Sequence, residues 1–498
     1  MSGGTISGNT IGTPGKGAGI QVWDGTAAVT VKMSGTARID ANNDVYLKNG
    51  RKITVDGQLN PPLGGVAACI TPESYNTTTQ VLTGSITDGT PQNYTKFTVT
   101  PKEDSGNTYY WEVDNQGKLM RIVDGVKYPY KAWKALKDVV SVAGTDPITI
   151  NGRIQATDDA DNQGPININD NITIKGKNGR DTDILDAGKK GGRIFIINDT
   201  LSNKLTLEKL TLKGGFVNGN DGAAILVGRD AEAELSACTI EECEALNGGA
   251  IAIWSNGKAT LTNTDIKNCS AKLFSGNTPP NGSGGAIYAA GGTVIMTNCT
   301  LTGNTAENNG GAVYAKKISS PTPILSTVTI EGGTIGGTGT NANKATGTGT
   351  GEGLGGGIYI GESCALNLKD YTDSSSNKHG AKVISNTAKA KGGGVYVDNG
   401  TFTMSGRATV TPSTGENKDK PRENDVYLPT GAKIDLSGIL APQGGTAARI
   451  TVPDANYAVT TQVLDGSITD NYTKFTVTPK GTTSWYVGSN GRLTTVKP

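Results

Sequence analysis

The sequence predicts an all-β solenoid, and three observations carry this prediction. The phrase Gly284-Gly-Ala-Ile-Tyr288 returns as Gly310-Gly-Ala-Val-Tyr314. Between the two phrases, apolar residues alternate with Thr and Asn, which is typical of strands with one buried face. Gly and Asn stand at the breaks, where turns need a positive φ. Strand and turn repeating at one period indicate a solenoid, and a coil of three short strands supplies its own return path. We therefore expect a right-handed parallel β-helix.

The period can be counted from the small residue that precedes an apolar one in each phrase. These markers are Ala224, Ala250, Ala286, Ala312, Gly357 and Gly394, spaced by 26, 36, 26, 45 and 37 residues. The shortest spacing is one coil, and the longer ones are a coil with an insertion. A second column, Cys238, Thr264 and Cys299, has spacings of 26 and 35 residues and agrees with this count.

The repeated phrases resemble those of a known family. The phrases are GGAI at 248–251 and 284–287, GGAV at 310–313, GGGI at 355–358 and GGGV at 392–395. They are similar to the GGA-[ILV] repeat of the chlamydial polymorphic outer membrane proteins. Leu301-Thr-Gly-Asn304 occupies the place of that family's Phe-x-x-Asn motif. The wider resemblance, over 222–410, is to bacterial surface β-helix proteins, namely adhesins and autotransporter passengers. It implies a secreted or surface-exposed binding protein.

A long duplication divides the chain. Asn43-Asp-Val-Tyr-Leu47 recurs as Asn424-Asp-Val-Tyr-Leu428, and Asn93-Tyr-Thr-Lys-Phe-Thr-Val-Thr-Pro101 recurs at 471–479. We therefore expect residues 1–63 to be the last coils of a first β-helix. Segments 64–124 and 441–498 are then two copies of a β-rich capping module, because an open solenoid end exposes unpaired backbone. If the module bound carbohydrate, its aromatic side chains would serve as platforms for sugar rings, but core packing of these side chains is the favoured interpretation. The residues are Tyr75, Tyr94, Tyr109, Tyr110 and Trp111.

Between the two rods the pattern changes to a helix. Within 129–143 one helical stripe holds Trp133, Leu136, Val139, Val140 and Ala143, with Pro129 in the first turn and Gly144 as the stop signal. We expect an amphipathic capping helix within 125–147. A second parallel β-helix then covers 148–440, with insertions at 272–283, 335–354 and 370–391 that should emerge on one side.

Composition excludes several classes of function. The 46 basic and 45 acidic residues give a net charge of +1, which argues against a nucleic-acid or anionic-membrane partner. Six cysteines without a CxxC pair and a single histidine, His379, argue against zinc. Cys243 and Cys269 are one coil apart, within reach of a disulfide, but two inward-facing small side chains are the favoured interpretation. Ile240 and Ile266 should be the next inward pair.

Candidates for chemistry are few, although pectate lyases and polygalacturonases share this fold. Asp158, Asp159 and Asp161 form the densest acidic stretch and are candidate calcium ligands, while a solvated turn is the commoner explanation. Glu241, Glu242 and Glu244, with Glu232 and Glu234 one coil earlier, would form either a negative patch or a charged, soluble strand edge. His379 lies in a polar loop without a Ser or Cys partner pattern, so we expect a surface histidine.

The sequence thus predicts a non-enzymatic bacterial cell-surface or secreted protein, with no catalytic residues and no cofactor. Its partners would be a host-surface or matrix protein or glycan. The alternative is a polysaccharide lyase or glycoside hydrolase of the pectate-lyase-like class. Met1 opens in what reads as the middle of a coil, so we expect a fragment that lacks its signal peptide and anchor. No apolar run approaches the ~20 residues of a membrane helix.

Overall fold

The computed structural model describes residues 1–498 except 12–16, 24–29, 41, 62–64, 105–106, 128–131, 143, 190–191, 199–201, 278–280, 320–321 and 412–422. The chain forms two compact units. Unit 1 comprises Met1–Lys127, Ala135–Asn151 and Ile172–Lys175, and unit 2 comprises Tyr128–Lys134, Gly152–Asn171 and Gly176–Pro498. Each unit is described by itself.

Unit 1 consists mainly of parallel strands that stack coil upon coil. One sheet has the order β2 (Ile20–Val22), β5 (Val45–Leu47), β7 (Ala68–Pro72) and β9 (Phe97–Val99), and a second has β3 (Val31–Gly35), β6 (Ile53–Leu59) and β8 (Leu82–Gly84); β1 (Thr5–Ile6) pairs with β4 (Arg38–Ile39). The parallel pairing therefore continues into the duplicated segment. It ends in the antiparallel strands β10 (Lys102–Asp104), β11 (Asn107–Val113) and β12 (Leu119–Asp124). A short 3-10 helix, Asn93–Lys96, precedes β9.

A helix interrupts the strands, as the sequence predicts. α1 spans Ala132–Val142, and Trp133, Leu136, Val139 and Val140 on it are buried. The side chain of Ala143 and the predicted first turn at Pro129 lie outside the described residues. Strands β13 (Ile148–Asn151) and β16 (Ile172–Gly176) follow, and β13 pairs in parallel with β12.

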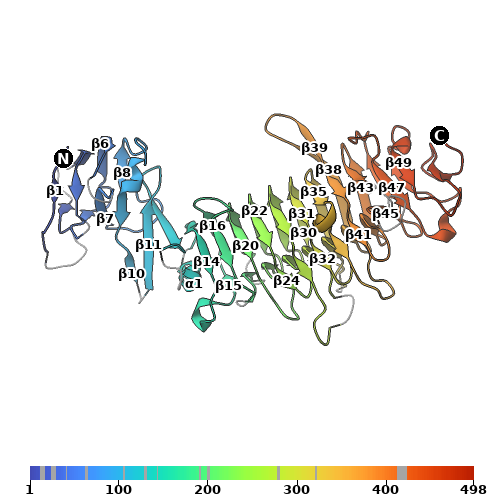
Figure 1. Cartoon of the computed structure of the whole chain (residues 1–498), viewed down its shortest axis with the longest axis horizontal. Coiled ribbons are helices and arrows are strands. Elements are labelled where there is room, and N and C mark those ends of the chain that lie inside the picture. The colour runs from blue at the N-terminus through green and yellow to red at the C-terminus, as the bar shows by residue number, and fades with distance from the viewer. Residues whose placement is uncertain are drawn as a thin grey trace. The chain divides into compact units, whose positions relative to one another are not determined.

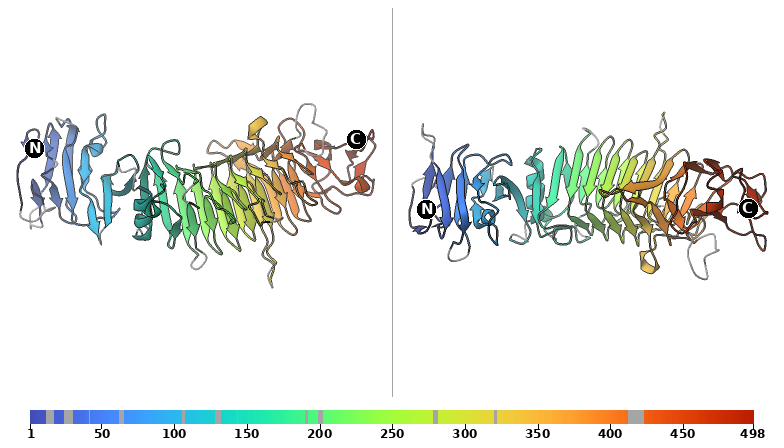
Figure 2. Two further views of the ribbon diagram at one scale, coloured as in Figure 1. Left: turned by 60° about the horizontal axis from the view of Figure 1, so that its bottom comes forward. Right: turned by 90° about the horizontal axis from the view of Figure 1, so that it is seen from above.

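Unit 2 is a solenoid whose parallel strands form three long ladders and one short ladder (Figures 1 and 2). Ladder A consists of β19 (Lys204–Glu208), β22 (Glu232–Ser236), β26 (Lys258–Thr262), β30 (Thr293–Thr297), β34 (Thr327–Glu331), β38 (Ala365–Thr372), β43 (Thr401–Ser405), β46 (Ile434–Ser437) and β48 (Leu464–Gly466). Ladder B consists of β14 (Arg153–Gln155), β17 (Ile184–Asp186), β20 (Thr211–Lys213), β23 (Thr239–Glu241), β27 (Asp265–Lys267), β31 (Thr300–Thr302), β35 (Thr334–Gly336), β40 (Lys382–Ile384), β44 (Thr409–Thr411), β47 (Ala448–Thr451) and β49 (Phe475–Val477).

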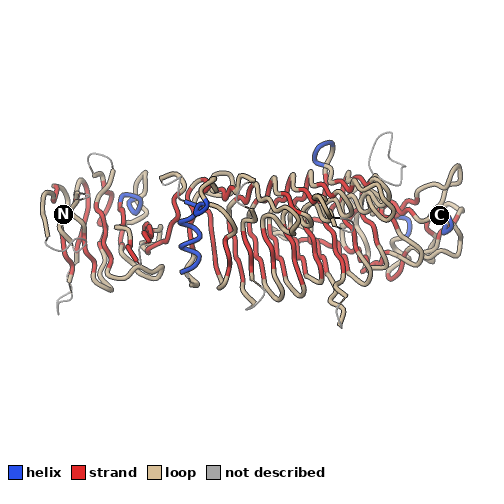
Figure 3. The backbone as a smooth tube through the Cα atoms, turned by 90° about the horizontal axis from the view of Figure 1, so that it is seen from below, coloured by secondary structure: helices blue, strands red, loops and turns tan. Residues whose placement is uncertain are grey.

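The other two ladders complete each coil. Ladder C consists of β15 (Ile166–Ile168), β18 (Phe195–Ile197), β21 (Ile225–Val227), β25 (Ile251–Trp254), β29 (Ile287–Ala290), β33 (Val313–Lys316), β37 (Ile358–Ile360), β42 (Val395–Val397) and β45 (Val426–Tyr427). The short ladder D consists of β24 (Glu244–Ala245), β28 (Ser270–Ala271), β32 (Thr305–Ala306), β36 (Lys344–Ala345) and β41 (Thr387–Ala388). Figure 3 shows the strands of successive coils lying side by side. The predicted all-β solenoid of parallel strands is confirmed.

Seven further described elements of unit 2 lie outside this regular course. They are β39 (Lys378–Gly380), the antiparallel pair β50 (Tyr486–Val487) and β51 (Leu493–Thr494), and the 3-10 helices Ala160–Asn162, Gly339–Asn341, Asp454–Asn456 and Tyr472–Lys474. The parallel pairs β46–β48 and β47–β49 extend the ladders into the second copy of the duplicated segment, just as β6–β8 and β7–β9 do in the first.

The core of unit 2 follows the predicted alternation. In β26 and β30 the second and fourth residues are buried and the flanking threonines and lysine are partly exposed. Ile240 pairs with Ile266, and both are fully buried. The predicted register of this column is therefore confirmed, and burying such side chains is the main stabilising contribution in a stacked solenoid.

Glycines in the repeated phrase have two distinct steric roles. Gly284 has a φ of 70°, and a Cβ there would lie 2.4 Å from the carbonyl oxygen of Ile287. A Cβ on Gly285 would instead lie 2.1 Å from the carbonyl oxygen of Gly311 in the next coil. The first glycine is thus required by backbone conformation and the second by the close approach of adjacent coils.

A column of buried polar side chains follows ladder B at its turn. Asn304, Asn343, Asn386 and Asn424 are buried in successive coils, and each amide oxygen accepts the backbone N–H of the asparagine or cysteine one coil earlier. Asn304 is the asparagine that stands in the motif resembling Phe-x-x-Asn. These side chains bond to one another and to backbone carbonyls, so the buried amide groups of the turn have hydrogen-bond partners within the protein.

Cys243 and Cys269 lie at this same turn, between ladders B and D. Cys269 precedes Asn304 in this column, and its N–H donates to Asn304 Oδ1 at 3.0 Å. All six cysteines are free thiols, and Cys243 and Cys269 are buried. Burial, together with the neighbouring thiol of Cys243, raises the pKa of Cys269. The interpretation of two inward-facing small side chains is confirmed.

The insertions, however, do not emerge on one side. The insertion at 272–283 falls in the sequence between a strand of ladder D and a strand of ladder C. In contrast, the 370–380 segment forms a β38–β39 hairpin between ladders A and B, which projects in Figure 1. A further excursion, closed by the Ile318–Ile324 bridge, lies between ladders C and A. The prediction was wrong because the marker phrase gives one landmark per coil and cannot tell which turn carries the extra residues.

Candidate functional site

The three candidate calcium ligands lie in an exposed turn of unit 2. Asp159 caps the 3-10 helix Ala160–Asn162 by accepting a hydrogen bond from the N–H of Asp161, at 3.2 Å. Asp158 and Asp161 are also exposed. In the described part of the chain, no three or more His, Cys, Asp or Glu side chains are grouped so that they could hold a metal ion. A calcium site at these aspartates stays a prediction.

The clustered glutamates are paired with lysines of adjacent coils. Glu241 lies 2.7 Å from Lys213 and 3.1 Å from Lys267, which belong to the coils before and after it. Burial acts to raise the pKa of Glu241, but hydrogen bonds from the two lysines outweigh it and lower the pKa. Similar pairs join Glu242 to Lys213, Glu244 to Lys272, Glu232 to Lys258 and Glu234 to Lys204. The possible negative patch is therefore a neutral, cross-coil ladder of ion pairs.

Aromatic side chains of the first duplicated module mostly pack inward. Trp111 and Tyr109 are buried, and the ring of Tyr75 lies 5.9 Å from that of Trp111. The hydroxyl of Tyr75 is 2.7 Å from Thr100 Oγ1. Trp111 and Tyr109 therefore present no open ring to a sugar, in agreement with the favoured interpretation of core packing.

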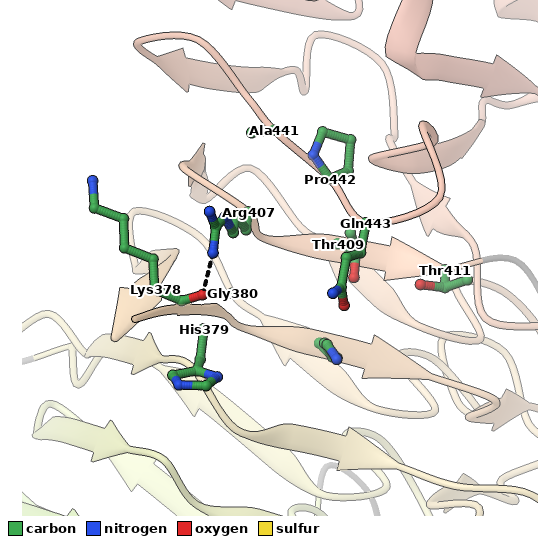
Figure 4. Close-up of a pocket in the computed structure, with 10 residues that line it drawn as sticks. Lys378, His379, Gly380, Arg407, Thr409, Thr411, Ala441, Pro442 and Gln443 are labelled. Carbon is green, nitrogen blue, oxygen red and sulfur yellow. Dashed lines mark hydrogen bonds between the residues drawn. The ribbon is translucent and has the colours of Figure 1, made fainter. Parts of the chain in front are cut away.

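A pocket of about 550 Å³ lies on the outer face of ladder B in unit 2. Its floor consists of outward-facing residues of adjacent strands, Lys382 on β40 with Thr409 and Thr411 on β44; Lys382 pairs with Thr409. One wall is the β38–β39 hairpin, and the other is the 441–443 loop that follows β46. Figure 4 shows side chains from both walls around this floor.

The projecting hairpin is fixed by the chain that follows it. β39 pairs antiparallel with the extended end of β38, so that Tyr371 is opposite His379. The guanidinium of Arg407 donates a hydrogen bond to the carbonyl oxygen of Lys378, as the dashed line in Figure 4 marks. The backbone N–H of Arg407 donates to Asp370 Oδ1 at 2.6 Å. The wall is therefore held in place before any ligand binds, which reduces the entropic cost of binding.

Positive charge dominates the lining of this basic pocket. Lys378, Lys382 and Arg407 line it, together with His379 and neutral hydroxyl and amide groups. Within the described residues, neither Lys378 nor Lys382 has a carboxylate within 4.0 Å. His379 is exposed, as predicted, and its Nε2 lies 2.9 Å from Asp373 Oδ2. This bond, with others from Asn377, lowers the pKa of Asp373 to about 2. The arrangement suits a ligand that carries anionic groups.

The sequence did not reveal this pocket. Its cationic residues are spread over 378–407, and the loop that closes it comes from the next coil. The only local signal is the concentration of Lys378, His379 and Lys382 at the end of an insertion. These residues indicate a basic pocket only once the folded coils place Arg407 beside the same hairpin.

The fold and the pocket define the class of molecule: an all-β solenoid of parallel coils with a preformed basic pocket on its side. Comparisons of the chain with protein-family models, with curated proteins and with solved structures found no match. Among the described residues, no helix combines the length and apolar character needed to cross a bilayer.

Proposed function

We propose that this chain is a segment of a non-enzymatic bacterial cell-surface or secreted β-helix protein, of adhesin or passenger type, that binds a host-surface or matrix ligand. The observation that carries the proposal is the basic pocket, with two unpaired lysine side chains among the described residues and a wall fixed by Arg407. The ligand that this chemistry favours is anionic, such as a carboxylated or sulfated glycan or an acidic protein surface. The extracellular location rests on the resemblance of the repeats.

Binding to immobilised polyanions tests the proposal. The double variant Lys378→Gln/Lys382→Gln should lower affinity at least about tenfold, and wild-type affinity should fall with added salt, because exposed charges are screened. The matched control is Lys344→Gln/Lys389→Gln, which removes the same charge from exposed positions by ladder D. Equal losses in both variants would show a diffuse charge effect, and unchanged affinity in the first would exclude the pocket.

A polysaccharide lyase or glycoside hydrolase of the pectate-lyase-like class is the second candidate. The favouring observation is that the His379–Asp373 pair borders a pocket that also holds Arg407 and Lys382. A lyase requires a base and cationic groups that face the sugar carboxylate. Incubation with acidic and neutral polysaccharides decides: release of unsaturated or reducing ends by wild type, abolished in His379→Ala, would establish the enzyme and contradict the adhesin proposal.

The finer features of the solenoid belong to the same proposal. In this proposal its coils are right-handed, the helix is the capping helix of the second β-helix, and the duplicated modules are C-terminal caps. Trp133 Nε1 donates to the carbonyl oxygen of Gly164 and the N–H of Lys134 to Asn162 Oδ1, both at 2.9 Å, which supports a helix fitted to the first coil. Deleting 441–498 should expose apolar coil ends and cause aggregation. A soluble, monomeric and equally stable 1–440 protein would instead indicate a separate binding module.

A further inference from the structure

The outward face of ladder C carries a continuous apolar row. The second residues of successive strands are Ile196, Leu226, Ala252, Tyr288 and Tyr314, paired in that order. The row continues as a stack of tyrosines, with ring centroids 4.7–5.6 Å apart from Tyr288 to Tyr427. Outward apolar residues on a strand need a cover, either from the chain itself or from a partner.

Within the part of the chain that the structure describes, side chains from the insertions cover one part of this row. Tyr288, Tyr314 and Tyr359 are buried, and side chains from the insertions, Leu354, Ile318 and Ala390, pack against them. Ile196 and Leu226 are only half-buried, and a pocket of about 400 Å³ opens over them. Among the described residues the row is therefore uncovered at this pocket, which we call the Trp254 slot.

Residue size creates the slot. The strand residues Ile197, Val227 and Ile253 pair with one another in adjacent coils. The residue that follows each of them therefore lies in one outward column, which consists of Asn198, Gly228 and Trp254. Gly228 contributes no side chain. A gap of two coil spacings, roughly 9.6 Å at ~4.8 Å per coil, therefore separates the Asn198 and Trp254 positions. Leu226 and Ile196 form the floor.

The indole is presented to solvent rather than packed away. Trp254 is 38% exposed, in contrast to the buried tyrosines of the same ladder. Tyr288 of the next coil supports it, with ring centroids 6.4 Å apart. Asn198, on the opposite side of the slot, is held by a hydrogen bond from its amide to Asn169 Oδ1. Both sides of the slot are thus preformed.

The edge of the slot is polar and cationic. Arg229 and Ser255 line it, and Arg229 is exposed with no carboxylate within 4.0 Å among the described residues. Asp230, its neighbour in the chain, accepts a hydrogen bond from Asn256 Nδ2 at 3.0 Å. An exposed guanidinium offers paired donors that match a carboxylate in a bidentate arrangement.

We propose that the Trp254 slot binds an acidic pyranose, a hexuronate residue of a polysaccharide. The apolar C–H face of the ring stacks on the indole and contacts Leu226. The ring hydroxyls meet Asn198 and Ser255, and the carboxylate meets Arg229. The combination of a flat aromatic face, an apolar floor and polar edges suits a sugar ring better than a purely apolar peptide side chain, which would leave the polar edges unpaired. The inference does not depend on the basic pocket, which lies on another ladder.

Calorimetric titration of the full chain with defined oligogalacturonates, and with a neutral glucan oligosaccharide of equal length, tests the inference. Trp254→Ala should lower uronate affinity at least about tenfold. Arg229→Gln should lower it by a similar factor. The matched control Trp23→Ala removes a tryptophan that is more exposed, at 53%, and should leave binding unchanged. Because the basic pocket would also take an acidic glycan, the titration is repeated in the Lys378→Gln/Lys382→Gln background. Trp254→Ala should lower uronate affinity by the same factor there, which separates the slot from the basic pocket.

Three outcomes would overturn the inference. One is that no oligogalacturonate binds. Another is that, in the Lys378→Gln/Lys382→Gln background, binding persists at full affinity after Trp254→Ala while the protein keeps its circular dichroism spectrum and melting temperature. The third is that the neutral oligosaccharide binds as tightly as the uronate and Arg229→Gln changes neither, because the slot would then not select an acidic sugar.

Discussion

Replacing Asn343 by alanine should loosen the coils around the buried asparagine column. Asn343 Oδ1 accepts hydrogen bonds from the N–H and the side-chain amide of Asn304, at 2.9 and 3.0 Å. Its own amide donates to the carbonyl oxygen of Leu301 and to Asn386 Oδ1, both at 2.9 Å. Truncation therefore removes four hydrogen bonds from a turn with no exposed surface at this residue.

The expected loss is about 4 kcal/mol, taking about 1 kcal/mol for each hydrogen bond. Donors and acceptors that remain buried without a partner increase this cost, so the value is a lower estimate. The loss is large beside the ~5–15 kcal/mol of a typical domain. Because a coil contacts mainly its neighbours, the effect should concentrate between the coils of Asn304 and Asn386 rather than spread over the chain.

Hydrogen exchange by mass spectrometry, with chemical denaturation alongside, measures both the size and the place of this loss. Asn367→Ala is the matched control, because Asn367 lies on the outer face of ladder A and is partly exposed. Among the described residues its side chain makes one long hydrogen bond, of 3.4 Å, to Thr329. It should change stability by less than about 0.5 kcal/mol. Equal protection in the two variants would refute the reasoning, as would uniform deprotection of the whole chain after Asn343→Ala.

Three further outcomes are expected. Ile266→Ala removes fully buried methylenes and should cost roughly 2–5 kcal/mol, with hydrogen exchange rising in the neighbouring coils while the duplicated modules stay protected. The hydrogen bond from His379 is the chief cause that lowers the pKa of Asp373 from 3.8 to about 2. This pair should therefore stabilise the hairpin above pH ~4, and the contribution should be lost as the pH falls through about 2. Carboxyl chemical shifts followed by NMR across this pH range, with His379→Ala as the comparison, check this. If the aspartates at 158, 159 and 161 bind calcium, titration calorimetry should show heat that their joint replacement by Asn removes.

Spacing in the sequence was enough to predict the strand register of the central coils. The 26-residue interval between Ile240 and Ile266 places them in adjacent strands, and the structure pairs them. The interval is informative because every coil must return to the same ladder, so equal chain length means equal position. The same logic predicted that Cys243 and Cys269 face inward one above the other. It failed for the insertions, since extra length does not reveal the turn from which it leaves.

The two sites depend on contacts that no local pattern describes. The basic pocket combines a hairpin, the residue Arg407 that secures it, and a loop one coil later. The Trp254 slot depends on Gly228, one of 71 glycines in the chain, whose importance appears only when its neighbours across the ladder are known. The glutamates likewise read as a negative patch until lysines of the coils before and after were seen to pair with them.

By itself, the sequence determined the solenoid, its buried columns and the glycines of its repeated phrase, because alternation and coil length are properties of neighbouring residues and of a fixed period. Only the tertiary structure decided which outward residues meet. The identities of outward-facing residues need not repeat from coil to coil. These side chains come together only because coils that are 26–45 residues apart in the chain stack on one another. The exposed charges and the open indole that carry the proposed binding are of this second kind, so their chemistry became visible only when the coils were stacked.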